Sequence, residues 1–397
     1  MNDRTLTGAT TPRRATIATR VYEPEAAAAA YRLGNLTRAL ERLGYRVTVL
    51  TTKSPGARRS STRVRRWPVL RDRSGAVRGY LQYLSFDVPL LFRLLFGPRA
   101  DVVVAEPPPT TGVVTRIACA MRRVPYVYFS ADVMSSALTA VKVSGIVRRA
   151  VTAMERWALR GAAEILAISD GVRNELEQLG TDPAKISVIG TGIDTALFSP
   201  DGEAEDAEPP YFLYAGTMSE FQGAAVFVDA FELVAAEHPD ARLVMFGGGV
   251  DIDLLTAKAA PLGNRVAFPG FVDAEVVARW TRGATASLAS VRPGQGYDFA
   301  FPTKTLASVS CGTPVVFAGV GPLRELVTDH NLGWSVDWDA RQVAGAMLDA
   351  LRAPRRRLGR STLDWLDANY SLRGAADRGA AAVDAVVGLR STVPSDN

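Results

Sequence analysis

The sequence predicts an α/β protein built as two doubly wound, Rossmann-like domains in tandem. Three observations predict it: 397 residues of which 47% are hydrophobic, short apolar runs that alternate with helical patterns in both halves, and one acidic, proline-flanked interruption between the halves. The length is generous for one ordinary domain and suits two of similar size. Charged residues make up 22% of the chain, a share that does not indicate disorder.

A strand–helix–strand pattern opens the chain. Ala15–Thr19 is an apolar run of strand length, and leucines then recur at spacings of three and four from Leu33 to Leu43, which places them on one face of a helix. Gly44 follows as a typical helix end, and the β-branched run Arg46–Leu50 predicts a second strand. A unit of this kind implies parallel strands.

The alternation continues through the first half and starts again in the second. Short apolar runs bounded by loop residues predict further strands. In the first half these are Val102–Ala105, Pro125–Phe129, Ile165–Ile168 and Ile186–Ile189, and in the second half Tyr211–Ala215, Arg242–Phe246, Val266–Phe268, Thr285–Leu288 and Pro314–Phe317. Helical patterns lie between them, so each half predicts an open parallel sheet with helices on both faces.

The domain boundaries follow from one acidic segment. Asp201–Pro210 is rich in acids and poor in apolar residues, as linkers often are. We expect a first domain at residues 1–200, a linker at 201–210, a second domain at 211–370 and a C-terminal helix within 371–397 that packs back on the first domain. Because open α/β sheets bind ligands at the carboxyl ends of their strands, we expect the two domains to face each other across a cleft.

Several classes of function are disfavoured by what the sequence lacks. No G-x-G-x-x-G follows the first strand and no G-x-x-x-x-G-K-[ST] occurs, which disfavours dinucleotide oxidoreductases and P-loop enzymes. Asp251 and Asp253 suit the start of a helix, and no metal site is expected. The two histidines, His238 and His330, lie in the second half, so the first domain supplies no histidine base.

Positive charge gathers in one stretch of the chain. The net charge is +5, and eight arginines lie from Arg58 to Arg78. Two interpretations stay open: a solvated loop, or a surface for an anionic lipid or a phosphorylated acceptor that brings peripheral membrane contact. Nucleic acid is not expected as a partner, because the stretch has little aromatic interleaving and no recognisable binding module.

The sequence favours a reducing, cytoplasmic setting. Cys119 and Cys311 lie far apart in apolar surroundings and predict buried free thiols. The first fifteen residues lack an apolar core segment, so no signal peptide is expected. The most apolar stretch, Leu81–Phe96, is too short and too charged to span a bilayer. We therefore expect a cytoplasmic protein whose membrane contact, if it has one, is peripheral on the inner face.

A glycine-containing loop in the second half predicts a phosphate site. The predicted strand Tyr211–Ala215 leads into Gly216-Thr217, and Gln222-Gly223 opens the next helix. A strand, a glycine loop and a helix start in this order leave backbone N–H groups free for phosphate. The alternative interpretation is an ordinary turn.

A second segment, residues 296–304, predicts the same chemistry more strongly. Pro302 suits a first helical turn, which places Thr303 and Lys304 at a helix N-terminus. A cation is unfavourable there unless an anion binds nearby, so Lys304 favours a phosphate ligand over a solvent-exposed side chain. Arg292 lies just upstream and adds a second cation.

Several segments, taken in their order along the chain, resemble glycosyltransferase family 4. In the first half they are Tyr22-Glu23-Pro24-Glu25, the helix from Leu33 to Leu43, residues 44–50, residues 155–169 and Val188–Asp194; in the second half they are Ala215–Gly223 and the segment from Pro302-Thr303-Lys304 to Val316. The similarity covers nearly the whole chain, and the order and spacing of the motifs carry it.

The resemblance implies a GT-B fold and transfer from a nucleotide-diphosphate sugar, UDP first among the nucleotides, with retention at the anomeric carbon, no cofactor and no obligatory metal. The acceptor is suggested by composition instead: a chain rich in alanine and arginine is typical of a GC-rich bacterial gene, so we expect a polysaccharide, a glycolipid or a natural product, that is, a carbohydrate or a glycosylated small molecule or lipid. The implied donor-binding residues are Gly216, Thr217, Gln222, Gly223, Gly270, Phe271, Arg292, Phe299, Thr303, Lys304 and Thr305. Catalytic roles fall on Asp132 and Lys304, and acceptor-side roles on Glu25, Ala26, Glu106 and Ser130.

The chain departs from the family pattern at this site. The paired glutamates of the pattern correspond to Phe299 and Ala307, and its diphosphate-loop cations to Thr217 and Gln222. Lys304 is then expected to carry most of the charge. Two other hypotheses stay open beside an active transferase: a non-catalytic GT-B partner protein, and a nucleotide-sugar epimerase or a phosphorylase on the same fold. The scarcity of histidine weakens the epimerase, and no pyridoxal lysine is evident for a phosphorylase.

Overall fold

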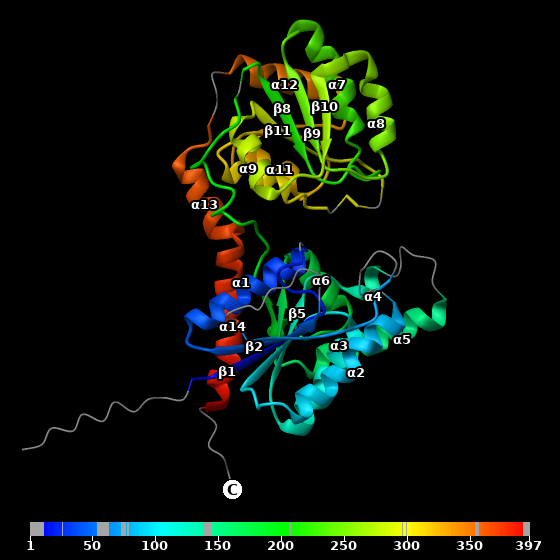
Figure 1. Ribbon diagram of the computed structural model, residues 1–397, viewed down its shortest axis with the longest axis vertical. Helices are drawn as coiled ribbons and strands as arrows, with labels where there is room; N and C mark the ends of the chain where they lie inside the picture. The colour runs from blue at the N-terminus through cyan, green and yellow to red at the C-terminus, as the bar shows by residue number, and fades with distance from the viewer. Residues whose placement is uncertain are drawn as a thin grey trace, which may run out of the picture. The chain divides into compact units, whose positions relative to one another are not determined.

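The computed structural model describes residues 12–25, 27–53, 63–72, 77, 79–137, 144–206, 208–295, 297–298, 300–353 and 357–391. The chain divides into two compact units, residues 1–191 with 372–397, and residues 192–371 (Figure 1). Residues 201–210 lie inside the second unit, and the last helix of the chain belongs to the first.

The first unit is built on a seven-stranded parallel sheet. Its strands are β1 (Arg14–Ala18), β2 (Arg46–Thr52), β3 (Arg63–Trp67), β4 (Val102–Ala105), β5 (Tyr126–Ser130), β6 (Glu164–Ala167) and β7 (Ile186–Val188). They lie in the order β3-β2-β1-β4-β5-β6-β7, so the order reverses between β1 and β4. The carboxyl ends of these two strands form the switch point at which such sheets bind ligands.

Helices cover both faces of this sheet. On one face α1 (Ala28–Arg42) and α14 (Leu372–Ser391) lie side by side (Figure 1). Two ion pairs join α14 to the rest of the unit, Arg42 to Asp377 at 2.5 Å and Arg13 to Asp384 at 2.6 Å. The opposite face carries α2 (Tyr80–Phe96), α3 (Pro109–Arg122) and α5 (Gly145–Gly161). The short helices α4 (Met134–Ala137) and α6 (Asp170–Gln178) complete the unit.

The second unit repeats the plan with six parallel strands. They are β8 (Tyr211–Ala215), β9 (Arg242–Phe246), β10 (Val266–Gly270), β11 (Ala286–Val291), β12 (Val315–Gly319) and β13 (Gly333–Val336), in the order β10-β9-β8-β11-β12-β13. Its helices are α7 (Ala225–Glu237), α8 (Ile252–Ala259), α9 (Ala274–Gly283), α10 (Lys304–Ser310), α11 (Pro322–Asp329), α12 (Ala340–Arg352) and α13 (Arg360–Tyr370). The switch point lies between β8 and β11.

The predicted fold class, two doubly wound α/β domains, is confirmed, and β3, β13 and α2 are among the elements that were not predicted. β3 lies in the arginine-rich stretch; it is an edge strand that exposes Arg63 and Arg65 and buries Trp67, and charged residues are common on sheet edges. β13 is a second edge strand with only half-buried residues, so it lacks an apolar run. α2 contains Pro89 and is apolar on nearly all sides, which conceals its helical period.

Candidate functional site

A pocket of about 630 Å³ opens at the carboxyl ends of the second sheet. The loop after β8 lines it with Gly216 and Thr217, the loop after β9 with Gly247, and the loop after β10 with Phe271. The segment from Ala300 to Thr305, which enters α10, forms another wall. Among the described residues that line the pocket, Lys304 is the only ionisable cationic side chain, and none of them is a carboxylate.

Backbone hydrogen bonds tie the glycine loops of this pocket to one another. The N–H of Gly216 donates to the Phe246 carbonyl at 3.0 Å, and the N–H of Gly247 donates to the Gly270 carbonyl at 2.8 Å. Gly247 has φ +110°, and a Cβ there would lie 2.0 Å from the Gly216 oxygen, so no other residue fits. The N–H of Met218 donates to Gly248. The N–H groups of Gln222 and Gly223 both donate to the Ser219 carbonyl oxygen at 3.0 Å, so the N–H groups of Gly216, Gln222 and Gly223, which we expected to be free for phosphate, are used within the protein.

Lys304 begins α10, as predicted; the residue as a whole is half-buried, and its amine lies between the Tyr214 ring and the Gln222 side chain. The Nζ atom lies 3.8 Å from the centre of the Tyr214 ring and 3.2 Å from Oε1 of Gln222. Burial lowers the pKa of this amine to about 7. A buried ammonium without a carboxylate partner favours an anionic ligand, because an anion supplies the charge that the protein leaves uncompensated.

Gln222 orients this lysine. Its side chain is 8% exposed, and its Oε1 lies 2.6 Å from the Tyr214 hydroxyl as well as beside Lys304. The Tyr214 hydroxyl is also 2.7 Å from the Thr217 carbonyl oxygen, which connects the group to the loop after β8. Gln222 and Thr217 both line the pocket, but neither brings the charge that the family pattern has at these positions.

The other predicted donor-site residues divide into two groups. Thr303, Thr305 and Phe271 line the pocket, and Phe271 is 81% exposed. Gly223, Gly270 and Arg292 are not among its lining residues. The Arg292 guanidinium lies 4.9 Å over the Trp338 ring, and Trp338 donates from Nε1 to the Gly223 carbonyl at 3.0 Å. Phe299 lies outside the described residues, and Ala307 lines the pocket.

Thr305 contributes an unusual polar atom to this wall. The residue is 1% exposed, and its hydroxyl has no hydrogen-bond partner within the described parts of the chain. A buried hydroxyl without a partner costs free energy, and such a cost is repaid where a ligand supplies the partner.

In the first unit, two carboxyls gather at the switch point. Glu106 follows β4 and accepts a hydrogen bond of 2.7 Å from the Thr19 hydroxyl, and Asp132 follows β5. Burial raises the pKa of both carboxyls, and the positive charges of Arg32 and Arg20 oppose that rise. Ser130 donates to the Asp132 carbonyl oxygen at 3.0 Å and so holds the turn after β5.

Sequence reasoning missed the two arginines of this group. Burial lowers the pKa of Arg32, which comes from α1, and its Nε has no partner among the described residues. Arg20 follows β1 and donates to the carbonyl oxygens of Val77 and Pro107 at 2.8 and 3.2 Å. The sequence did offer a signal for Arg32: it is a cation next to Leu33, on the otherwise apolar face of the predicted helix.

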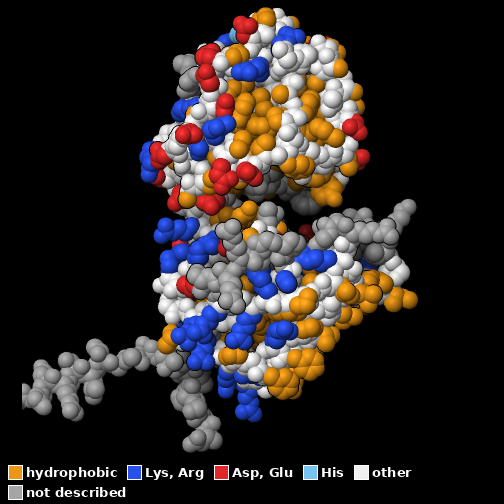
Figure 2. All heavy atoms as spheres, viewed as in Figure 1, with side chains coloured by type: hydrophobic (Ala, Val, Ile, Leu, Met, Phe, Trp, Pro, Cys, Tyr) orange, Lys and Arg blue, Asp and Glu red, His pale blue; other side chains and the backbone are white. Residues whose placement is uncertain are grey.

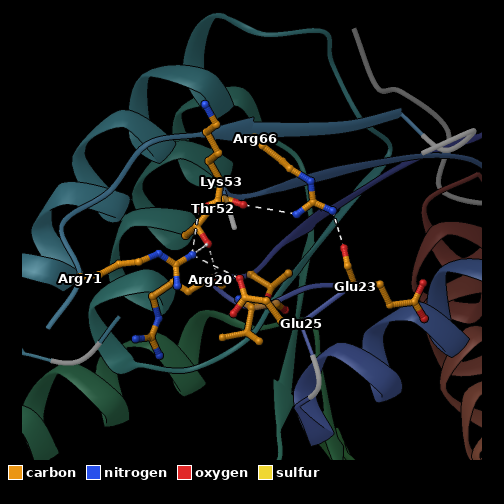
Figure 3. Close-up of polar contacts among 9 residues, drawn as sticks. Arg20, Glu23, Glu25, Thr52, Lys53, Arg66 and Arg71 are labelled. Atoms are coloured by element: carbon orange, nitrogen blue, oxygen red, sulfur yellow. Dashed lines mark hydrogen bonds and ion pairs between the residues drawn. The ribbon is translucent and has the colours of Figure 1, made fainter. Parts of the chain in front are cut away.

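Glu25 takes part in a different arrangement, in which two arginines of the basic stretch are internal (Figure 3). Arg71 pairs with Glu25 at 3.2 Å and also donates to the Thr52 hydroxyl at 3.0 Å. Arg66 donates to backbone carbonyl oxygens of Glu23 and Thr52. Four further arginines of the stretch lie outside the described residues: Arg58, Arg59, Arg73 and Arg78. Of the predicted acceptor-side residues, Ala26 also lies outside them.

The described residues contain no group of three or more His, Cys, Asp or Glu side chains placed to hold a metal ion. Cys119 and Cys311 are buried free thiols, as predicted.

Similarity to known proteins indicates the class of protein to which this fold and this pocket belong. A family model described as a glycosyl transferase 4-like domain matches residues 28–192, and one described as glycosyl transferases group 1 matches residues 209–353. The chain is 30% identical over 240 residues to a glycogen synthase of Mycobacterium tuberculosis, and the match covers 56% of each protein. The chain thus spans little more than half the length of this relative.

Solved structures show the same architecture. Sucrose-phosphate synthase from Thermosynechococcus elongatus superposes with a TM-score of 0.71 at 19% identity, over 95% of this chain and 100% of that one. Anabaena HepE in complex with UDP and glucose superposes with a TM-score of 0.63 at 16% identity, over 96% and 99% of the two chains. These are GT-B folds. This chain therefore has a GT-B fold, and its resemblance to glycosyltransferase family 4 is confirmed by the two family models.

Proposed function

We propose that this protein is a retaining glycosyltransferase that moves a sugar from a nucleotide-diphosphate sugar to a carbohydrate, a glycolipid or a glycosylated natural product, without a catalytic metal or cofactor. UDP is the proposed nucleotide, which the UDP complex of the structural neighbour HepE supports. We place the protein in the cytoplasm, which two buried free thiols suit.

One observation carries this proposal: the ammonium of Lys304 in a pocket without carboxylates. A nucleotide-diphosphate sugar has two negative phosphates between two uncharged parts. Lys304 would contact the phosphates, and apolar side chains elsewhere in the same pocket, Phe271 among them, suit the base. A glycosyl transfer increases the charge on the departing diphosphate, so a cation fixed at this position stabilises the transition state more than the ground state.

The proposed reaction is a substitution on one face of the sugar. As the bond between the anomeric carbon and the diphosphate oxygen breaks, the acceptor hydroxyl forms the new bond on the same face and passes its proton to that oxygen. Lys304 stabilises the leaving group, and we assign the carboxyl of Asp132 to the acceptor or to the reacting carbon. One bond to the anomeric carbon breaks and one forms, and the acceptor proton moves to the leaving oxygen, so the step needs no external base.

A thermal-shift screen tests the donor class. We expect one nucleotide family among UDP, GDP, ADP and dTDP, free or sugar-linked, to raise the unfolding temperature. A ligand at a hundred times its Kd adds about 2.7 kcal/mol to the free energy of unfolding, which gives a clear shift. The same screen on Lys304→Met is the control, and the shift should shrink there. No shift of the native protein with any nucleotide would contradict the proposal.

The buried hydroxyl of Thr305 yields a second test. Thr305→Val keeps the shape of the side chain and removes the unpartnered polar atom, so we expect an unfolding temperature equal to or above that of the native protein. UDP affinity should fall by about tenfold, because a ligand hydrogen bond of about 1.4 kcal/mol is lost. Isothermal titration calorimetry measures that change.

A matched control for Thr305→Val is Thr313→Val. Thr313 is equally buried, but its hydroxyl donates to the Thr281 carbonyl at 2.7 Å. That variant should lose stability and keep its nucleotide affinity. The reverse pattern would show that the Thr305 hydroxyl has no ligand partner.

A non-catalytic GT-B partner protein is the second candidate. Its support is Ala307, which lines the pocket at a position where the family pattern has a glutamate. Such a protein would bind the nucleotide sugar and stay inactive towards every acceptor. An assay that measures free UDP separates the two candidates. We expect a competent transferase to hydrolyse its donor slowly, with water as the acceptor, and so to release UDP, whereas a non-catalytic partner protein releases none.

A further inference from the structure

Three helices cover one face of the first unit and form a single surface. α3 packs against α2 on one side and against α5 on the other. Their buried side chains, such as Phe86, Ala118 and Ala158, belong to one core cluster with the sheet. The outward sides of α2, α3 and α5 therefore lie next to one another, and we call them the three-helix face.

The three-helix face carries positive charge without exposed negative charge. The helices contain one, two and four arginines, and two acids, Asp87 and Glu155. Each acid is 1% exposed. Asp87 accepts a hydrogen bond of 2.6 Å from the Thr111 hydroxyl, and Glu155 accepts from the N–H groups of Met134 and Ser135, both at 2.9 Å. Both carboxyl groups are buried and hydrogen-bonded inside the unit, so the exposed charged side chains of these three helices are all positive.

Most of this charge is on α5. Its arginines, Arg148, Arg149, Arg156 and Arg160, are exposed and border a hollow of about 560 Å³. Thr152 and Trp157 line the same hollow, and Trp157 is 41% exposed. No ion pair is found for these four arginines within the described residues. They are available to an anion outside the protein.

α2 adds an apolar stripe to the same face. Its exposed side chains recur at spacings of three and four: Leu81 is 69% exposed, Leu84 51%, Val88 50%, Phe92 55% and Phe96 80%. Side chains at these spacings share one side of a helix. Phe86, Leu90 and Leu94 lie on the other side and are buried. Figure 2 shows hydrophobic and basic side chains, and few acidic ones, over this part of the first unit.

The stripe continues into a pocket of about 630 Å³ between α2 and the sheet. Val88, Phe92 and Phe96 line it together with Arg65, Arg93 and Arg122. A largely apolar hollow whose lining also carries cations has room for a hydrocarbon chain beside an anionic headgroup. No helix in the described part of the chain is both long enough and apolar enough to cross a bilayer.

We propose that the three-helix face docks on an anionic lipid bilayer, with the α2 stripe inserted at the level of the headgroups and the α5 arginines paired with lipid phosphates. Helices with an apolar side and a basic side bind at such interfaces, and their affinity depends on both parts. A soluble polyanion would use the arginines and leave five large apolar side chains in water. A protein partner with an acidic surface would likewise leave the apolar side chains of α2 without an apolar surface to contact.

This surface differs from the Arg58–Arg78 stretch that the sequence suggested. Two arginines of that stretch, Arg66 and Arg71, make internal contacts, whereas the four α5 arginines face outward. The inference does not depend on the proposed transferase activity, because vesicle binding is measured without a donor or an acceptor.

Co-sedimentation of the full chain with vesicles tests the proposal. We expect binding to vesicles of equal parts phosphatidylglycerol and phosphatidylcholine, and little binding to phosphatidylcholine alone. Changing Arg148, Arg149, Arg156 and Arg160 to Gln should weaken binding at least about a hundredfold, since each cation near an anionic surface contributes about fivefold. Leu84→Ser with Phe92→Ser should weaken it at least about tenfold, because apolar area no longer enters the bilayer.

Matched controls come from the second unit. Arg279, Arg341, Arg352 and Arg360 changed to Gln remove the same charge elsewhere, and Leu233→Ser with Leu254→Ser removes exposed apolar side chains of similar size. Both controls should bind vesicles as the native chain does, and circular dichroism checks that all variants fold.

The proposal fails if the native chain does not bind the anionic vesicles. It also fails if the control sets weaken binding as much as the test sets, since general charge or hydrophobicity would then be the cause. Loss of binding in the arginine variant with no change in the leucine and phenylalanine variant would contradict insertion. In that case, competition by inorganic polyphosphate would identify a soluble polyanion as the ligand.

Discussion

Lys304→Ala is expected to lower kcat/KM at least about a hundredfold, the effect of losing one group that stabilises charge in the transition state. The reason is specific to this pocket. Among its described lining residues Lys304 is the only cation, and the family's other diphosphate-loop charges are replaced by Thr217 and Gln222. No other described side chain that lines the pocket can therefore replace Lys304 in stabilising the negative charge of the departing diphosphate.

Steady-state kinetics with the donor identified by the thermal screen measures this loss. Lys258→Ala is the control, because Lys258 pairs with Asp229 at 2.5 Å on the surface and leaves the pocket unchanged. Lys304→Met keeps the length of the side chain and should resemble Lys304→Ala. Near-normal turnover of both Lys304 variants would remove this lysine from the site.

The pH dependence of donor binding follows from the same amine. In the unliganded protein burial holds the pKa of Lys304 at about 7, so the group is largely neutral above that pH. A bound diphosphate favours the ammonium and raises this pKa, so binding takes up a proton. Donor affinity should then fall as pH rises above 7, by up to about tenfold per unit. Calorimetry in buffers of different ionisation enthalpy detects the proton, and the Lys304→Met variant should show neither effect.

Much of this fold follows from the sequence because central parallel strands are buried on both faces. β4, β8 and β9 were predicted at their observed bounds, since each is a continuous apolar run. β3 and β13 were missed because edge strands are half solvated and lack that run. Local chemistry also predicted the position of Lys304, as Pro302 and the helix pattern need no distant partner.

The surroundings of each candidate group could not be predicted in the same way. Gln222 meets Lys304 across 82 positions of sequence, and Tyr214, at the end of β8, contacts both side chains. The group around Asp132 brings Arg20 and Arg32 from elements far earlier in the chain. Spacing along one chain says nothing of such contacts, because they depend on which strand lies beside which.

Asp132→Asn is the other variant for which we expect a large loss of activity. We expect kcat to fall between about a hundredfold and ten-thousandfold, the range seen when a positioned acid or base is removed. The donor Kd should stay unchanged, because Asp132 belongs to the first unit and the donor pocket is formed by residues of the second. Single-turnover assays and calorimetry separate the two quantities, and Asp240→Asn, at an exposed position, is the control.

Stability distinguishes this role from a structural one. Burial raises the folded-state pKa of Asp132, so the carboxyl stabilises the fold at low pH and that contribution is lost as pH rises through the raised pKa. At neutral pH the buried carboxylate is a cost that the neutral amide avoids. Asp132→Asn should therefore unfold at the same temperature as the native protein or a higher one while it loses turnover. A variant that loses stability and turnover together would show that Asp132 supports the fold; one that loses neither would show that it does nothing at the site.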